Sequence, residues 1–119
     1  MYSETRPWGS FHVLDEAPGS KVKRIVVTPG GKLSLQSHKH RGEHWTVVNG
    51  TATITVDNKI VALTRSQSID IPKGAKHRLE NLHDGLVEII EVQFGDYLGE
   101  DDIVRYDDIY GRAPVEVKP

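Results

Sequence analysis

Hydrophobic and polar residues alternate in short stretches along most of this chain. Between residues 51 and 56, for example, threonines alternate with Ala52, Ile54 and Val56. Successive side chains of a β-strand point to opposite faces, so this period of two predicts a strand with one buried face. Alternation and β-branched residues together predict strands over residues 22–28, 32–40, 43–48, 51–56, 59–63, 68–71, 77–81 and 86–94.

The segments between these strands carry turn residues. Pro29-Gly30-Gly31 and Pro72 end two strands, and Asp57-Asn58 separates two others. Asn49-Gly50 predicts a type I′ hairpin between residues 43–48 and 51–56, because both central positions of that turn need positive φ angles. Many short strands with regular turns predict an all-β protein, built as an antiparallel sandwich or barrel.

The length of 119 residues fits a single compact domain, 1–119. Its core is expected at about 20–97, after an N-terminal arm (1–19) and before a C-terminal extension (98–119). The extension departs from the β pattern, because Gly99–Ile109, with acidic residues near its start, predicts a short helix. We interpret the acidic residues of the extension as a solvated face: Asp101, Asp102, Asp107 and Asp108.

Composition excludes several classes of function. The chain has no Cys, so a disulfide framework, a thiolate zinc site and a thiol nucleophile are ruled out. A formal charge of −2 gives no electrostatic case for a nucleic acid or an anionic membrane as partner. The N-terminus lacks the basic start and apolar core of a signal peptide, and no apolar run reaches the length of a membrane span. We therefore expect a cytoplasmic protein.

Histidines cluster beside one glutamate. Three of the six His, at positions 38, 40 and 44, fall within seven residues and flank Glu43, and His77 follows from a distant predicted strand. Imidazole nitrogen and carboxylate oxygen suit Zn, Mn, Fe, Co or Ni. A closed barrel is needed to bring these strands together around one metal ion. We interpret the other histidines as structural or exposed: His12, His44 and His83.

The spacing of this cluster resembles the two motifs of the cupin family. The first reads Gly30, five residues, Gln36-Ser37-His38, four residues, Glu43, six residues, Gly50. The second reads Pro72-Lys73-Gly74, two residues, His77, three residues, Asn81. The resemblance implies a double-stranded β-helix, or jelly-roll barrel, with a metal inside. The chain departs from the pattern at Ser66, which replaces the opening Gly of the second motif, and at Gln36, which replaces the first His.

Two registers of the first motif remain open. The ungapped register takes Gln36, His38, Glu43 and His77 as metal ligands, with His40 in the pocket beside them. The other register pairs His38 with His40, which leaves a gap before Glu43 that is one residue too short. Gln36, His38 and His40 share a face of the predicted strand, so strand geometry permits either. We favour Gln36, because a Gln in this place resembles the metal site of mannose-6-phosphate isomerases.

Longer stretches narrow the resemblance. They are similar to the C-terminal cupin domain of type II mannose-6-phosphate isomerases, which is often fused behind a mannose-1-phosphate guanylyltransferase. The resemblance covers about Arg6–Arg112 and rests on 6–9, 33–36, 40–45, 47–52, 77–81 and 97–105. No Gly-rich phosphate loop opens the chain, so the transferase activity is not implied. The resemblance implies a mannose-6-phosphate isomerase in GDP-mannose and polysaccharide biosynthesis, with a homodimer that pairs through sheet edges.

That isomerisation moves a proton between C1 and C2 of the sugar through a cis-enediol. It needs an acid–base group, and a divalent metal as Lewis acid, for which zinc is the expected ion and Mn, Co, Ni and Fe are compatible. We assign His40 and Arg78 to catalysis. As the base, His40 is ranked above Glu80 and Glu91. Arg41, Lys39 and Lys76 are assigned to the sugar phosphate as substrate-binding residues.

Other functions fit the same motifs. A non-catalytic cupin could bind a sugar phosphate or nucleotide-sugar and serve as partner of a separate guanylyltransferase. A different cupin enzyme, such as a dioxygenase or another sugar isomerase, is the third hypothesis, because the cupin fold hosts many chemistries.

Overall fold

The structure, a computed structural model, describes residues 2–107. Strands and the turns between them make up this range, which contains no helix, and the predicted all-β class is confirmed. The strands are β1 (Ser3–Arg6), β2 (Gly9–Ala17), β3 (Ser20–Val27), β4 (Leu35–Ser37), β5 (Arg41–Asn49), β6 (Ala52–Val56), β7 (Lys59–Leu63), β8 (Ser68–Ile71), β9 (His77–Glu80), β10 (Val87–Gly95) and β11 (Val104–Asp107).

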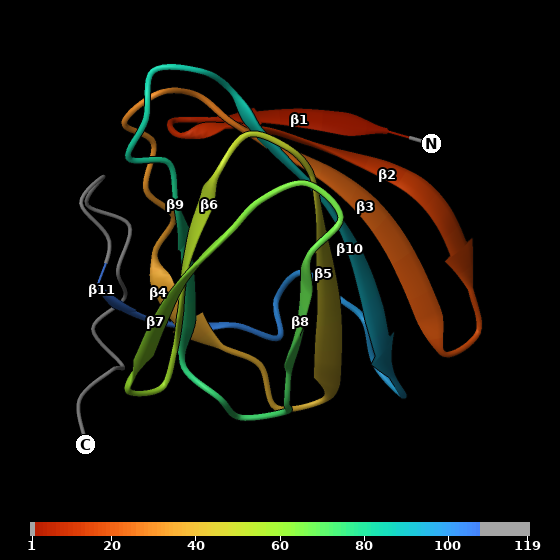
Figure 1. Cartoon of the computed structure of the whole chain (residues 1–119). Coiled ribbons are helices and arrows are strands. Elements are labelled where there is room, and N and C mark those ends of the chain that lie inside the picture. Colours follow the sequence, from red (N-terminus) through yellow and green to blue (C-terminus); the bar gives the residue numbers. More distant parts are fainter. Residues whose placement is uncertain (1, 108–119) are drawn as a thin grey trace.

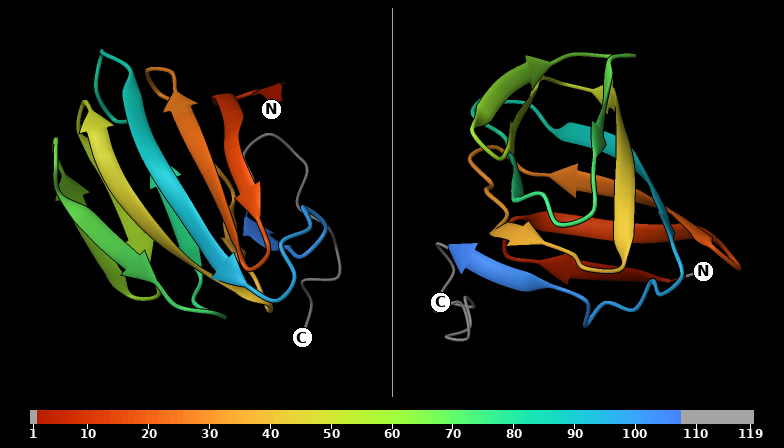
Figure 2. Two further views of the ribbon diagram at one scale, coloured as in Figure 1. Left: turned by 90° about the vertical axis from the view of Figure 1, so that its right-hand side faces the viewer. Right: turned by 90° about the horizontal axis from the view of Figure 1, so that it is seen from below.

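Two antiparallel sheets face each other (Figures 1 and 2). Sheet A has the strand order β1-β2-β3-β10-β5-β8, and sheet B has the order β11-β4-β9-β6-β7. Consecutive strands often lie in different sheets, so the chain crosses repeatedly between the two layers. Residues far apart in sequence therefore meet on the facing inner surfaces.

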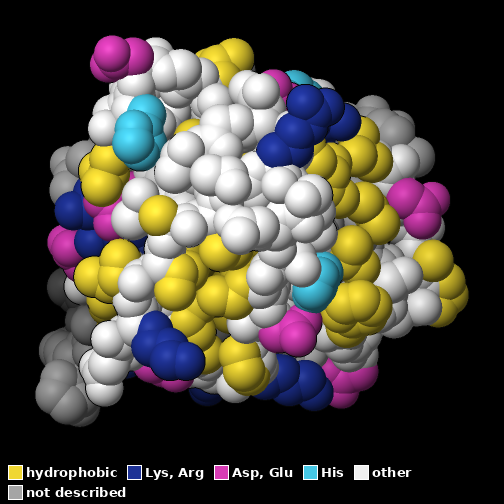
Figure 3. Space-filling view, viewed as in Figure 1, with side chains coloured by type: hydrophobic (Ala, Val, Ile, Leu, Met, Phe, Trp, Pro, Cys, Tyr) yellow, Lys and Arg dark blue, Asp and Glu magenta, His cyan; other side chains and the backbone are white. Residues whose placement is uncertain are grey.

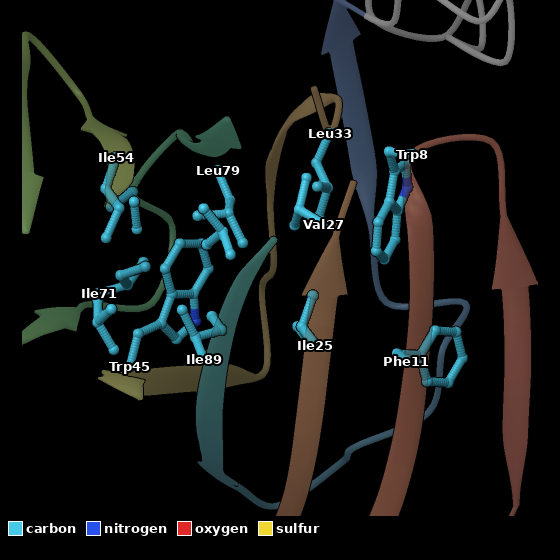
Figure 4. Packing of buried hydrophobic residues seen from close by; sticks show 14 of the residues in the cluster. Trp8, Phe11, Ile25, Val27, Leu33, Trp45, Ile54, Ile71, Leu79 and Ile89 are labelled. Atoms are coloured by element: carbon cyan, nitrogen blue, oxygen red, sulfur yellow. The ribbon is translucent and has the colours of Figure 1, made fainter. Parts of the chain in front are cut away.

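The hydrophobic core lies between the two sheets (Figure 4). Sheet A contributes Ile25, Trp45 and Ile89, and sheet B contributes Ile54 and Leu79, all buried. Burial alternates along the sheet A strands that carry Ile25, Trp45 and Ile89, as the period of two predicts. In β6 and β9 the first three residues are all buried, so both faces of these strands are covered there. The side chains of the two sheets meet in the space between the layers, which is the usual way that a β-sandwich buries its apolar surface.

Two strands precede the expected core. The segment interpreted as an arm forms β1 and β2, and it contributes Phe11 and Val13 to the hydrophobic core. The backbones of β2 and β3 approach closely at Gly9, where an added Cβ would lie 2.0 Å from the Val26 carbonyl oxygen. Only glycine fits there. The alternation of Phe11 and Val13 with polar residues was the signal for β2 that the sequence prediction missed.

The predicted hairpin at Asn49-Gly50 is wrong. β5 pairs with β10 and β8 in sheet A, whereas β6 pairs with β7 and β9 in sheet B. A type I′ turn needs positive φ at both central residues, and only Gly50 of this pair has it, at 80°. The Asn49 side-chain N–H₂ donates instead to the Leu86 carbonyl, 3.2 Å away. The turn therefore carries the chain from one sheet to the other.

The predicted helix over 99–109 is also wrong within the described residues, and positions 108 and 109 lie outside them. The chain forms a turn near Gly99 and then β11, which pairs with β4. Val104 lies opposite Ser37 and Arg105 opposite Gln36. Backbone groups at the edge of β4 find partners in β11, which a helix would leave unpaired.

The acidic residues of this segment do not form one solvated face. Asp101 and Asp107 are exposed, but Asp102 is buried. Its carboxylate accepts hydrogen bonds from the backbone N–H groups of Lys39 and His40, at 3.0 and 2.9 Å. The predicted strand over 32–40 is reduced to β4, and after its end at Ser37 the N–H groups of residues 39 and 40 bond to Asp102 and not to a neighbouring strand. Asp108 lies outside the described residues.

The surface shown in Figure 3 has no large area of a single charge. Lys and Arg side chains lie scattered among Asp, Glu, hydrophobic and uncharged groups. Within residues 2–107, no helix is long and apolar enough to cross a membrane.

Candidate metal centre and active site

The inner face of sheet A changes character along its central strands. At one end Ile25, Ile89 and Val47 lie side by side in register across β3, β10 and β5. Two positions further along β10 the same face carries Lys23 and Glu91 in register. All of these side chains are buried. The sandwich therefore has an apolar end and a polar end, and the candidate site lies at the polar end.

Three buried side chains converge there as a potential metal-binding group. His38 follows β4, Glu43 lies on β5 and His77 begins β9, and one donor atom from each lies within 4.8 Å of the others. The His38 Nε2 lies 3.3 Å from Glu43 Oε2, and the His77 Nε2 lies 3.9 Å from Glu43 Oε1. The imidazole ring centroids are 5.0 Å apart. This arrangement brings together three of the four residues predicted as metal ligands.

Gln36 adjoins this group. It lies directly opposite His77 in the pairing of β4 with β9, and both side chains line the same cavity. The Gln36 side-chain N–H₂ donates to Ser34, 3.1 Å from its hydroxyl oxygen. Because the nitrogen is held by Ser34, the carboxamide oxygen is the atom left to act as a ligand.

His40 lies elsewhere. The prediction that His40 occupies the pocket is wrong, because its side chain is 53% exposed and packs edge-on against Tyr97. The chain leaves the strand after Ser37, so the alternation that would have turned His40 inward does not continue. The exposed position of His40 therefore argues against the register in which His38 and His40 are both metal ligands. His44 also faces outward, where its Nδ1 lies 2.6 Å from an Asp70 carboxylate oxygen.

Hydrogen bonds fix the orientation of both imidazoles. The His38 Nδ1 lies 2.6 Å from the Asp102 carbonyl, and the His77 Nδ1 lies 3.0 Å from the Ala75 carbonyl. A carbonyl only accepts, so each Nδ1 carries the proton and each Nε2 presents a lone pair toward Glu43. Metal-bound histidines commonly have this second hydrogen bond. The donors present therefore fit a divalent first-row metal ion, with neutral imidazoles, a carboxylate and an amide oxygen.

The Glu43 carboxylate also has partners within the protein. Its Oε1 accepts from the Trp45 indole N–H and its Oε2 accepts from Arg41, both at 2.8 Å. A second Arg41 nitrogen lies 3.2 Å from the His38 Nε2. Trp45 is buried in the core, and its ring also lies edge-on to His77. These contacts hold Glu43 rigidly at the centre of the group.

Burial and neighbouring charges set the protonation of the group. Burial lowers the pKa of His38 to about 4, and it lowers the pKa of His77 as well. Burial alone would raise the pKa of Glu43. Positive charge on His77, Arg41 and His38, where the histidines are protonated at low pH, outweighs burial and holds this pKa below its ordinary value. At neutral pH both imidazoles are consequently neutral and Glu43 is ionised. Metal ligands need these protonation states.

A cavity of about 130 Å³ adjoins the group. Its wall carries five cationic side chains: Arg6, Lys23, Arg41, Arg78 and Arg105. Arg78 is buried and donates to the Leu33 carbonyl at 2.8 Å. Lys39 and Lys76, predicted to bind substrate, are exposed and do not line this cavity. Of the predicted cationic residues, the fold thus brings only Arg41 and Arg78 to the cavity.

Sequence reasoning missed Lys23, Glu100 and Asp102. Lys23 is buried on β3, and its Nζ lies 2.6 Å from a Glu100 carboxylate oxygen. The signal was a charged residue on the face of β3 that also carries the buried, β-branched Ile25 and Val27. Such a position marks a polar site or a buried ion pair. Nothing in the local sequence pointed to Asp102, because its partners are 62 and 63 residues away.

Residues 2–108 match the family of mannose-6-phosphate isomerase C-terminal domains. The chain belongs to this family. It is similar to the xanthan biosynthesis protein XanB of Xanthomonas campestris pv. campestris (strain B100), with 54% identity over 91% of the chain and 23% of that protein. It is also similar to the alginate biosynthesis protein AlgA of Pseudomonas syringae pv. tomato, with 56% identity over 91% of the chain and 22% of that protein.

A mannose-1-phosphate guanylyltransferase of Klebsiella pneumoniae is 50% identical over 91% of the chain and 23% of its own length. The chain therefore spans about a quarter of the length of these curated relatives.

Solved structures confirm the fold that the cupin motifs implied. The capsular polysaccharide assembling protein CapF of Staphylococcus aureus has a TM-score of 0.76 with 21% identity, over 91% of this chain and 32% of that one. A double-stranded β-helix protein of Klebsiella pneumoniae has a TM-score of 0.71 with 21% identity, over 81% of this chain and 82% of that one. The fold of this chain is a cupin double-stranded β-helix.

Proposed function

We propose that this domain interconverts mannose 6-phosphate and fructose 6-phosphate with the help of a bound divalent metal ion. The observation that carries the proposal is the convergence of His38, Glu43 and His77 on a cavity that also holds Arg78 and a buried carboxyl, Glu91. Family membership supports it, since the family is named for this isomerase. Names of relatives in xanthan and alginate biosynthesis favour a role in supplying mannose units for polysaccharides.

The metal ion would be held by His38, Glu43 and His77, with Gln36 as a further ligand. When bound, it supplies Lewis acidity that stabilises negative charge developing on the sugar oxygens. Arg41 and Arg78 would bind the phosphate, because a guanidinium matches phosphate oxygens with two parallel hydrogen bonds. The apolar part of the cavity wall, including Trp8 and Leu79, would limit the entry of water to the reacting carbons.

We assign the acid–base step to Glu91 in place of His40. Glu91 lies on β10, lines the cavity and accepts a hydrogen bond from the Gln93 side chain. Burial and the negative charge of Glu43 raise its pKa to about 7, while Lys23 and Arg41 act in the opposite direction. A carboxyl that titrates near neutral pH can take a proton from one sugar carbon and return it to the other.

The direct test is conversion of mannose 6-phosphate by the purified domain after loading with Zn²⁺, Mn²⁺ or Co²⁺, with elemental analysis of the bound metal. Glu43→Gln should weaken metal binding by more than about 100-fold, above the range for residues that only support a ligand, and should lose activity with it. Glu88→Gln is the matched control, because Glu88 lies on β10 and pairs with Arg24 away from the cavity. A metal-loaded domain without turnover would refute the proposal.

Glu91 has its own test within the same assay. Glu91→Gln should retain the metal but lose exchange of the sugar C2 proton with deuterated solvent. Retention of exchange at the wild-type rate would remove Glu91 from the step and leave the isomerase proposal standing.

The second function is a non-catalytic domain that binds a sugar phosphate or nucleotide-sugar. It is favoured by the similarity of the chain to a relative that is named for guanylyltransferase activity. Calorimetric titration with mannose 6-phosphate and GDP-mannose, showing binding without turnover, would support it. The homodimer and the cytoplasmic location stay predictions.

A further inference from the structure

The segment from Leu98 to Asp107, here called the C-terminal strap, crosses from sheet A to sheet B beside the candidate site. Its first part is tied to β3, since Lys21 donates to the Leu98 carbonyl at 3.0 Å and Lys23 contacts Glu100 at 2.6 Å. Its last part is β11, which pairs with β4. The strap is therefore anchored at both ends to strands whose side chains line the cavity.

Asp102 lies between these anchors and holds His38 in two ways. Its carboxylate oxygens accept the backbone N–H groups of Lys39 and His40, which fixes the chain directly after His38. Its own carbonyl accepts the His38 Nδ1–H at 2.6 Å, which fixes the ring. Asp102 is only 9% exposed, so water does not readily replace these bonds. One residue thus sets both the position and the orientation of the imidazole.

We infer that Asp102 is a positioning residue that locks His38 in the tautomer and orientation needed to bind the metal ion. The inference rests on the proposed metal site. A histidine binds a metal through a ring nitrogen with a free lone pair, and the hydrogen bond at the other nitrogen decides which one that is. The Asp102 carboxylate keeps its own carbonyl in place by holding the neighbouring backbone. Residues that orient a ligand in this way typically affect metal affinity by about 10–100-fold.

Asp101 provides a matched control for Asp102. It is the preceding residue, carries the same charge and is exposed, with a hydrogen bond from the Tyr97 hydroxyl. Substitution at either position removes one negative charge from the strap, but only substitution at Asp102 releases the residues that hold His38. A difference between the variants therefore reports the contacts and not the net charge.

The experiment compares Asp102→Asn, Asp102→Ala and Asp101→Asn with the wild type in the full chain. Zn²⁺ affinity is measured by competition with a chelating dye, and the histidine tautomers of the metal-free protein are measured by long-range ¹⁵N–¹H NMR. We expect affinity to fall by about 10–100-fold in Asp102→Ala, less in Asp102→Asn and under about twofold in Asp101→Asn. His38 should change from a single Nδ1–H tautomer to a mixture in Asp102→Ala.

The two readouts separate this inference from the metal proposal. Wild-type Zn²⁺ affinity with an unaltered His38 tautomer in both Asp102 variants would overturn the inference. Failure of the wild type to bind Zn²⁺, Mn²⁺ and Co²⁺ would overturn the metal proposal, and the NMR comparison would still decide whether Asp102 fixes the ring. If Asp102→Ala does not fold, Asp102→Asn, which keeps the shape of the side chain, decides the outcome by the same criteria.

Discussion

The two halves of β10 face the same interior but have opposite chemistry. Val87 and Ile89 face the apolar core, whereas Glu91 lines the candidate site and Gln93 hydrogen-bonds to Glu91, and all four are buried. Strand, alternation and burial are the same in both halves, and only the side chains differ. The comparison therefore isolates the effect of polar side chains in the interior, both on stability and on the candidate site.

The apolar half gains free energy from each buried side chain, while the polar half must compensate for lost hydration. Glu91 meets Lys23 across the pairing with β3, and the Gln93 side chain donates to Glu91, yet the side-chain oxygen Oε1 of Gln93 has no hydrogen-bond partner in the described residues. A buried polar group without a partner destabilises a fold. We conclude that the apolar half stabilises the domain and that the polar half lowers its stability, as is common at functional sites.

The largest expected effect is on stability, at the apolar half. Ile89→Ala should lower the free energy of unfolding by about 2–5 kcal/mol, because it removes buried methyl groups and leaves a cavity. Urea denaturation measures the change. Ile60→Ala, at a position that is 70% exposed, is the control and should change stability by about 0.5 kcal/mol at most. Equal losses of free energy of unfolding in the two variants would contradict the view that the apolar half of β10 stabilises the domain.

The next effect, at the polar half, has the opposite sign. Glu91→Gln should stabilise the domain by about 3 kcal/mol above pH 7, and the gain should vanish below pH 4.5. The measurement is urea denaturation between pH 4 and about 8.5 in the presence of a chelator, which removes proton release linked to metal binding.

The sign follows from the raised pKa of Glu91, about 7 when folded against an ordinary 4.5. Below pH 4.5 both states carry the proton, and the carboxyl causes no loss of stability. As the pH rises toward 7 the unfolded chain ionises first, so wild-type stability falls until the folded carboxyl ionises as well. A gain that is independent of pH would show that Glu91 does not titrate between these values.

The smallest effect is expected at His40, outside both halves. His40→Asn should change kcat/KM for mannose 6-phosphate by less than about threefold, since substitutions at exposed sites typically alter free energies by about 0.5 kcal/mol or less. Steady-state kinetics beside Glu91→Gln would measure the contrast. If His40→Asn lowered kcat/KM as much as Glu91→Gln does, His40 would again be the preferred base. The chemistry would then not be confined to the polar half of the interior.

Much of the fold and part of the candidate site could be predicted from the sequence. Alternation correctly located the strands that carry Glu43, Ile54 and His77, because burial of one face is a local property of a strand. It failed at Asn49-Gly50 and after Ser37, where the conformation depends on partners far away in the chain. In a continuous strand, Gln36, His38 and His40 would share one face, as we inferred. The strand ends at Ser37, however, so this rule does not apply to His38 and His40.

The sequence by itself determined the all-β class, the two-part motif and the residue types able to bind a metal ion, because these follow from local periodicity and from the chemistry of the side chains. Only the tertiary structure decided which of them meet. Pairing of β4 with β9 placed Gln36 opposite His77, and the end of β4 at Ser37, where the following N–H groups bond to Asp102, left the His40 side chain outside the cavity. The position of His40 depends on contacts between residues more than 60 positions apart in the sequence. Alternation along one strand carries no information about such contacts.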